Sequence, residues 1–217
     1  MDYTRQKGWF EADIWNKEVH IIGVGAVGSW VALQLAKMGV KKINVYDFDK
    51  VEAHNLCNQV YGINDIGKHK VKALAETIYN TTGITINASI RRVTQKQAKK
   101  MNGFVFVLTD TMKSRSEIFE GLKNSNAEHL VETRMGAECG RVYTINLDDV
   151  YACNAYKSTL YTDEEAETSL CGTSITLLPT ALNIASLACW AVIKDYKGLD
   201  QDYELLVDYE YNNFLKS

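Results

Sequence analysis

Short continuous runs of apolar residues alternate along the first two thirds of the chain with stretches whose apolar positions follow helical spacing. The runs predict strands at residues 19–22, 43–46, 103–110, 129–133 and 142–147, and the alternation of apolar and polar residues predicts another at 84–90. The other stretches predict helices that end before Gly39, at 70–79 and at 114–122. The run at 103–110 is too apolar for a surface element and favours a central parallel strand. Strands that alternate with helices indicate an α/β fold with a Rossmann-like, doubly wound, mostly parallel sheet.

The last third of the chain has a weaker pattern. A polar, acidic stretch at 161–169 reads as a mobile loop, and 179–193 predicts a buried helix. Residues 203–211 favour a closing strand pair, which would give the sheet an antiparallel C-terminal extension.

Composition narrows the class of protein. The chain has 217 residues, of which 46% are hydrophobic and only one is proline, so we expect a single domain, residues 1–217, with a sizeable core and no flexible linker. A formal net charge of -3 supplies no basic field for nucleic acid, so small molecules or proteins are the expected ligands. The N-terminus lacks an apolar signal core and the longest apolar region is interrupted by polar residues. We therefore expect a cytoplasmic protein that does not engage a membrane.

A G-x-G-x-x-G turn follows the first predicted strand and opens a helix. In such a turn Gly23 makes the sharp bend, Gly25 lets a phosphate approach the backbone, and Gly28 allows close packing of helix on strand. Asp47 ends the second strand, where an acceptor for ribose hydroxyls belongs. The turn predicts a nucleotide site, although glycines also make plain strand–helix turns.

Further polar residues follow the predicted strands, at the edge where ligands of parallel sheets bind. They are Asp47, Asp49, Asn55, Gln59, Lys70, Asp110 and Arg115. Each of these residues can also be explained without a ligand: the aspartates can begin loops or cap helices, and a lysine is commonly exposed to solvent on the surface. Their joint spacing favours a phosphate site.

At these residues the chain resembles the ThiF and MoeB family, relatives of ubiquitin-activating enzymes, through its G-x-G-x-x-G, D-x-D, N-x-x-x-Q, G-x-x-K and T-D patterns. The resemblance implies an ATP- and Mg²⁺-dependent adenylyltransferase that acts on the C-terminal glycine of a small ubiquitin-like or sulfur-carrier protein, or of a peptide. It also implies a ThiF-like domain with an N-terminal helical arm (1–18), a nucleotide-binding core (19–147), and a crossover loop with C-terminal helix and strands (148–217).

The same resemblance assigns roles to individual residues. Asp47 would hold the ribose, Asn55 and Lys70 would contact phosphates, and Asp110 would bind magnesium, with Asp49 and Gln59 completing the nucleotide-binding set. The N-terminal Y-T-R-Q motif would place Arg5 as the arginine that reaches across a homodimer into the partner's ATP site. Converging cations suit this chemistry because the attacking carboxylate and the leaving pyrophosphate are both anionic.

The chain departs from the family pattern at Asn58, which stands where N-x-x-R-Q has its arginine. Losing one preorganised donor to a phosphoryl transition state costs about 2 to 4 kcal/mol, so either Arg134, Arg115 or Lys68 compensates or activity is impaired. The C-x-x-C pairs of zinc-binding members are also absent, and the five widely spaced cysteines predict free thiols and no zinc.

Cys171 lies where several family members have a cysteine that receives the activated carboxylate or its sulfur derivative. A buried small side chain is an equally good interpretation of it, and the other four cysteines favour structural roles. The acidic residues 163–167 are expected to move over a bound tail.

Two other functions remain open. The asparagine and the compact length suit a non-catalytic partner subunit that dimerises and binds nucleotide. A nicotinamide-dependent oxidoreductase would share the glycine turn and Asp47, but it leaves Asn55, Gln59, Lys70 and Asp110 unexplained.

Overall fold

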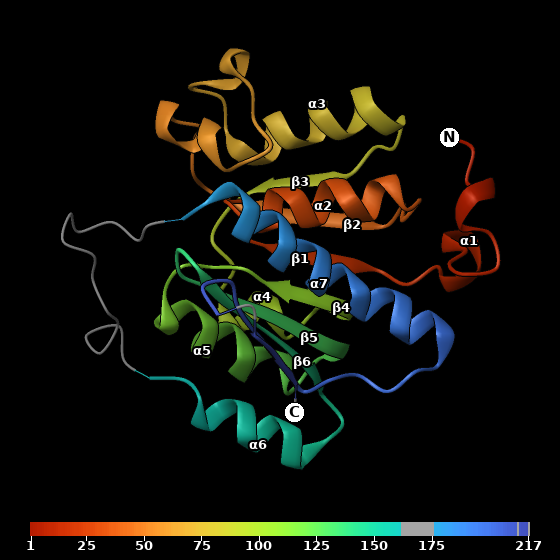
Figure 1. The fold of residues 1–217 in the computed structure, drawn as a ribbon, viewed down its shortest axis with the longest axis vertical. Coiled ribbons are helices and arrows are strands. Elements are labelled where there is room, and N and C mark those ends of the chain that lie inside the picture. Colours follow the sequence, from red (N-terminus) through yellow and green to blue (C-terminus); the bar gives the residue numbers. More distant parts are fainter. Residues whose placement is uncertain (162–175, 212, 217) are drawn as a thin grey trace.

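The computed structural model describes residues 1–161, 176–211 and 213–216. Across these ranges one eight-stranded sheet, in the order β3-β2-β1-β4-β5-β6-β7-β8, runs through the molecule (Figure 1). The first five strands of this order pair in parallel, and β6, β7 and β8 pair antiparallel. The expected doubly wound, mostly parallel sheet with an antiparallel C-terminal extension is therefore confirmed.

The strands are β1 Val19–Ile22, β2 Ile43–Asp47, β3 Asn87–Ile90, β4 Asn102–Val107, β5 Asn126–Met135, β6 Cys139–Asn146, β7 Glu204–Asp208 and β8 Asn213–Lys216. The helices are α1 Ala12–Trp15, α2 Gly28–Lys37, α3 Lys70–Thr82, α4 Gln95–Ala98, α5 Met112–Leu122, α6 Val150–Ser158 and α7 Leu178–Lys197, with 3-10 turns at Thr4–Gln6, Ala53–Cys57 and Ile63–Asp65.

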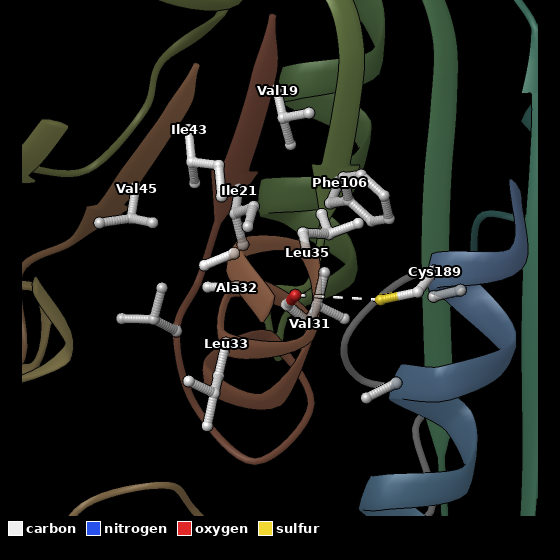
Figure 2. Close-up of a cluster of buried hydrophobic side chains, with 14 of the residues drawn as sticks. Val19, Ile21, Val31, Ala32, Leu33, Leu35, Ile43, Val45, Phe106 and Cys189 are labelled. Carbon is white, nitrogen blue, oxygen red and sulfur yellow. Dashed lines mark hydrogen bonds between the residues drawn. The ribbon is translucent and has the colours of Figure 1, made fainter. Parts of the chain in front are cut away.

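Two apolar layers enclose the sheet. On one face α2, α3 and α7 bury a core with the strands, and on the other face α4, α5 and α6 bury a second core. Figure 2 shows the first layer where α7 packs on α2: the Cys189 thiol lies 3.9 Å from the carbonyl oxygen of Val31. Burial raises the pKa of this thiol, as suits the structural role expected of it.

The sheet reverses its winding between β1 and β4. The chain passes from β1 through α2 to β2 on one side, and later returns through α4 to β4, which pairs with the other side of β1. In open α/β sheets the crevice at such a switch point, beyond the carboxyl ends of the strands, is where ligands bind. The glycine turn and the Thr109–Asp110 dipeptide both lie there.

Several boundaries differ from the sequence expectation. Helix α6 was not predicted: the Asp149 carboxylate caps it by accepting hydrogen bonds from the Tyr151 and Ala152 amides, at 2.8 and 3.1 Å, and only Cys153 and Tyr156 are buried on it. The closing strand pair exists, but its second strand is Asn213–Lys216, beyond the expected limit of 211. β3 begins at Asn87, three residues later than expected.

The N-terminal arm consists of the turn at Thr4–Gln6 and α1. Its Gln6 amide donates to the Met38 carbonyl oxygen at 2.7 Å, and its Trp15 indole donates to Asp195 at 2.6 Å. The arm therefore packs against the C-terminal ends of α2 and α7. Among the described residues, no helix is long and apolar enough to cross a bilayer.

Candidate functional site at the sheet switch point

The glycine turn after β1 combines two glycines that the fold requires with one that faces open space. Gly23 has a φ of +90°, and a Cβ there would lie 2.6 Å from the Leu108 carbonyl oxygen at the end of β4. A Cβ on Gly28 would lie 2.0 Å from the Gly23 carbonyl oxygen. At Gly25, in contrast, a Cβ would meet no described heavy atom within 4 Å beyond its chain neighbours. The turn thus offers its backbone to a ligand at Gly25.

The Asp47 carboxylate is fixed beside this turn. Its two oxygens accept hydrogen bonds from the amides of Val24 and Asp49, both at 2.9 Å. The side chain is half-buried, and each oxygen retains a lone pair for a further donor. Because the backbone holds the carboxylate in one orientation, Asp47 suits an acceptor role toward two adjacent hydroxyls.

Residues 58–61, called the strap here, are hydrogen-bonded to the glycine turn and to α2. The Tyr61 hydroxyl donates to the Val24 carbonyl oxygen at 2.7 Å, and the Trp30 indole of α2 donates to the Asn58 carbonyl oxygen at 3.0 Å. Burial raises the pKa of Tyr61, so its hydroxyl remains a donor at neutral pH. Gln59 is also in the strap, and its Oε1 is buried with no hydrogen-bond partner among the described residues.

Lys70, the first residue of α3, is placed close to the aspartates. Its ammonium group lies 3.1 Å from Asp49 Oδ2, and its side chain is only 11% exposed. Asn55 has a local bond instead: its side-chain oxygen accepts from the Glu52 amide at 2.9 Å and stabilises the turn at Ala53–Cys57. The structure therefore brings Lys70 and Asp49 together, whereas Asn55 is bound within its own turn.

Asp110 follows β4 as an exposed carboxylate. It does not cap α5, because the residue that caps this helix is Thr111, whose hydroxyl accepts from the Ser114 amide at 3.2 Å. No hydrogen bond or ion pair joins the Asp110 carboxylate to another residue that the structure describes. The preceding Thr109 hydroxyl is buried and also unpartnered within those residues. A carboxylate in this state suits Mg²⁺, which commonly takes one or two protein carboxylates and completes its shell with water and phosphate oxygens.

Arg5 is not part of this arrangement. Arg5 is exposed on the N-terminal arm, which packs at the C-terminal end of α2, whereas the glycine turn lies at its N-terminal end. A ten-residue helix separates the two, about 15 Å at 1.5 Å per residue. Cys171 and the acidic stretch 163–167 lie outside the described residues.

A buried ionic cluster near the end of β5 was missed by sequence reasoning. Glu132 is fully buried between two arginines, at 3.1 Å from Arg115 Nε and 3.0 Å from Arg134 Nε. Arg134 also donates to the carbonyl and hydroxyl oxygens of Thr159, at 2.9 and 2.8 Å. Burial opposes the charge of Arg134, but Glu132 together with the nearby hydroxyls of Tyr143 and Tyr156 raises the arginine's pKa. The E-T-R spacing placed both charges on one face of a strand, yet it gave no sign that the face was buried.

The residues proposed to replace the family arginine have acidic partners already. Arg115 and Arg134 both pair with Glu132, and Lys68 pairs with Asp65 and Glu76 at 3.1 and 2.7 Å. In the described part of the chain, none of the three is free to supply the missing charge without giving up an ion pair.

Comparison with known protein families adds a match over nearly the entire chain. The model of the ThiF family matches residues 7–214. Ubiquitin-like modifier-activating enzyme 5 of Caenorhabditis elegans is 42% identical over 63 residues, which are 29% of this chain and 15% of the relative. The probable adenylyltransferase/sulfurtransferase MoeZ of Mycobacterium tuberculosis is 32% identical over 118 residues, which are 54% of this chain and 28% of the relative. The chain thus matches only a minor part of these longer proteins.

Solved structures share the fold. The chain superimposes on PaaA with a TM-score of 0.74 at 19% identity, covering 94% of this chain and 73% of PaaA. It superimposes on Escherichia coli MccB crystallised with ATP with a TM-score of 0.68 at 16% identity, covering 93% and 63%. At these identities the likeness concerns architecture alone. The family match from residue 7 to residue 214, together with this shared architecture, places the chain in the ThiF family.

Proposed function

We propose that the protein is an ATP- and Mg²⁺-dependent adenylyltransferase that activates the C-terminal carboxylate of a small ubiquitin-like or sulfur-carrier protein, or of a peptide. One observation carries the proposal. The switch point brings together an open backbone at Gly25, the fixed acceptor Asp47, and Asp110, an exposed carboxylate that is not used to cap a helix. Family membership supports it, since MoeZ is named a probable adenylyltransferase and MccB has been crystallised with ATP.

The reaction is a displacement at phosphorus. A carboxylate oxygen of the carrier forms a bond to the α-phosphorus of ATP, the bond from that phosphorus to the bridging oxygen breaks, and pyrophosphate leaves with the electron pair. Turn amides beyond Gly25 would hold phosphate oxygens, and Asp47 would accept hydrogen bonds from the ribose. Asp110 would hold magnesium, which supplies charge neutralisation for the polyphosphate.

Lys70 would act near the phosphates from a preformed position. Its ammonium group is buried and already paired with Asp49, so its side chain is ordered before any ligand arrives. A polyphosphate would compete with one carboxylate for this charge, and Asp49, at 50% side-chain exposure, is free to turn toward solvent. Asn55 and Gln59 complete the proposed nucleotide-binding set.

The test is exchange of labelled pyrophosphate into ATP in the presence of Mg²⁺ and Gly-Gly-terminated candidate carriers from the same genome. Asp110→Asn is expected to reduce exchange about a hundredfold or more, because the metal loses its carboxylate. Asp148→Asn is the matched control: this exposed aspartate follows β6, whose antiparallel direction places it away from the carboxyl ends of the parallel strands. Equal exchange in wild type and Asp110→Asn would contradict the proposal.

A non-catalytic, nucleotide-binding partner subunit is the second candidate, and Asn58 is the observation that favours it. The family's arginine is missing there, and Arg115, Arg134 and Lys68 are engaged elsewhere. Binding of ATP with Mg²⁺ in the absence of exchange with every carrier tested would support this function. Binding of NAD in preference to ATP would exclude both candidates.

A further inference from the structure

Asn58 makes a long-range contact that its place in the family pattern does not explain. Its side-chain amide donates to the hydroxyl of Thr176 and lies 3.5 Å from the Thr176 carbonyl oxygen, 118 residues away in sequence. Asn58 is only 8% exposed. Thr176 is the first residue of the described range 176–211 and lies two residues before α7. This contact therefore joins the strap to the beginning of the C-terminal helix.

The strap itself is bonded to the glycine turn and to α2. Besides the Tyr61 and Trp30 contacts, the Val60 amide donates to the Ser29 hydroxyl at 3.2 Å in the first turn of α2. Asn58 therefore links two helices. Its backbone carbonyl oxygen is hydrogen-bonded to α2, the helix that follows the glycine turn, and its side chain is hydrogen-bonded to the residue just before α7. An arginine directed toward phosphates would not make this contact.

We propose that Asn58 is a positioning residue that couples the start of α7 to the nucleotide site, in place of the charge that the family arginine supplies. The inference rests on the proposed ATP binding. While Asn58 holds Thr176, the strap and the glycine turn bonded to it are ordered before the nucleotide arrives. If the contact is removed, part of the binding free energy is consumed in ordering the strap, and nucleotide affinity falls.

The test is a double-mutant cycle on affinity for AMPCPP, a non-hydrolysable ATP analogue, measured with Mg²⁺ by isothermal titration calorimetry. Asn58→Ala removes the donor and Thr176→Val removes the hydroxyl acceptor. Each is expected to weaken affinity about fivefold, the usual scale of one neutral hydrogen bond. The double variant is expected to be no weaker than either single variant, because both substitutions delete the same contact.

Thr180→Val is the matched control. Its hydroxyl donates to the Ala137 carbonyl oxygen at 2.6 Å, so it attaches the same end of α7 to the turn between β5 and β6 and not to the strap. This variant is expected to lower the free energy of unfolding, measured in urea, and to leave AMPCPP affinity within twofold of wild type.

Four outcomes would overturn the inference. Unchanged affinity in both single variants, or additive losses in the double variant, would refute the coupling and leave the proposed function standing. An equal loss of affinity in Thr180→Val would show that the effect follows general loosening of α7. A wild-type protein that binds no AMPCPP would refute both the coupling and the proposed function.

Discussion

Gly25 and Gly28 belong to one motif, but the proposed approach of a phosphate constrains Gly25, whereas packing against the Gly23 carbonyl oxygen constrains Gly28. The φ of Gly25 is not positive and space is open beside it, so Gly25→Ala is expected to leave the free energy of unfolding within about 1 kcal/mol of wild type. The added methyl group would occupy the phosphate approach and weaken ATP binding about tenfold or more, about 1.4 kcal/mol. In Gly28→Ala the methyl group meets the Gly23 carbonyl oxygen and should destabilise the fold by about 2 kcal/mol. Urea unfolding and calorimetric titration of ATP together check the contrast; loss of stability in Gly25→Ala would contradict it.

Individual side chains were predictable from sequence where the backbone alone determines their position. The glycine turn and Asp47 lie where the spacing put them, because a strand, a turn and a helix fix them within a few residues. The Asn58–Thr176 contact depends on pairing across 118 residues and left no local pattern. The sequence left Asp110 open as a helix cap, and the structure shows that Thr111 caps α5 instead.

At the scale of elements, the central strands and the longer helices that bury a well-defined face were predicted, whereas α6 and β8 were not. Helix α6 buries only two side chains and is held by its Asp149 cap, and β8 is exposed along its whole length. Neither leaves an apolar period in the sequence. The parallel core strands were recognisable because both of their faces are buried.

Two arginines on adjacent strands, Arg134 of β5 and Arg141 of β6, are expected to differ greatly in how much each contributes to the free energy of unfolding. Arg134 and Arg141 are register partners, but Arg134 neutralises the fully buried Glu132, whereas Arg141 is 49% exposed and pairs with Glu204. Arg134→Met is expected to lower the free energy of unfolding by about 3 kcal/mol or more, because it leaves a buried carboxylate undercompensated. Arg141→Met should cost less than about 1 kcal/mol. Urea denaturation of both variants checks this, and similar losses would show that Glu132 does not depend on Arg134.

At the scale of the whole molecule, the fold class followed from the sequence but the strand order did not. Alternating strands and helices are compatible with several orders, since order depends on which edges pair. In the structure β4 returns to pair with β1, and this pairing creates the switch point that gathers Gly25, Asp47 and Asp110. The same arrangement leaves the N-terminal arm at the opposite end of α2.

That separation makes the proposed role of Arg5 testable by complementation between subunits. We expect Arg5→Ala and Asp110→Asn each to abolish pyrophosphate exchange, Arg5 because it would complete the partner's site in a homodimer. In a co-expressed mixture, a mixed dimer would contain one site with an intact Asp110 and an intact Arg5 from the other subunit. Random pairing would restore about a quarter of wild-type activity, since half of the dimers are mixed and each has one complete site. No recovery would show that Arg5 acts within its own chain, and full activity of Arg5→Ala alone would show that it has no part in the reaction.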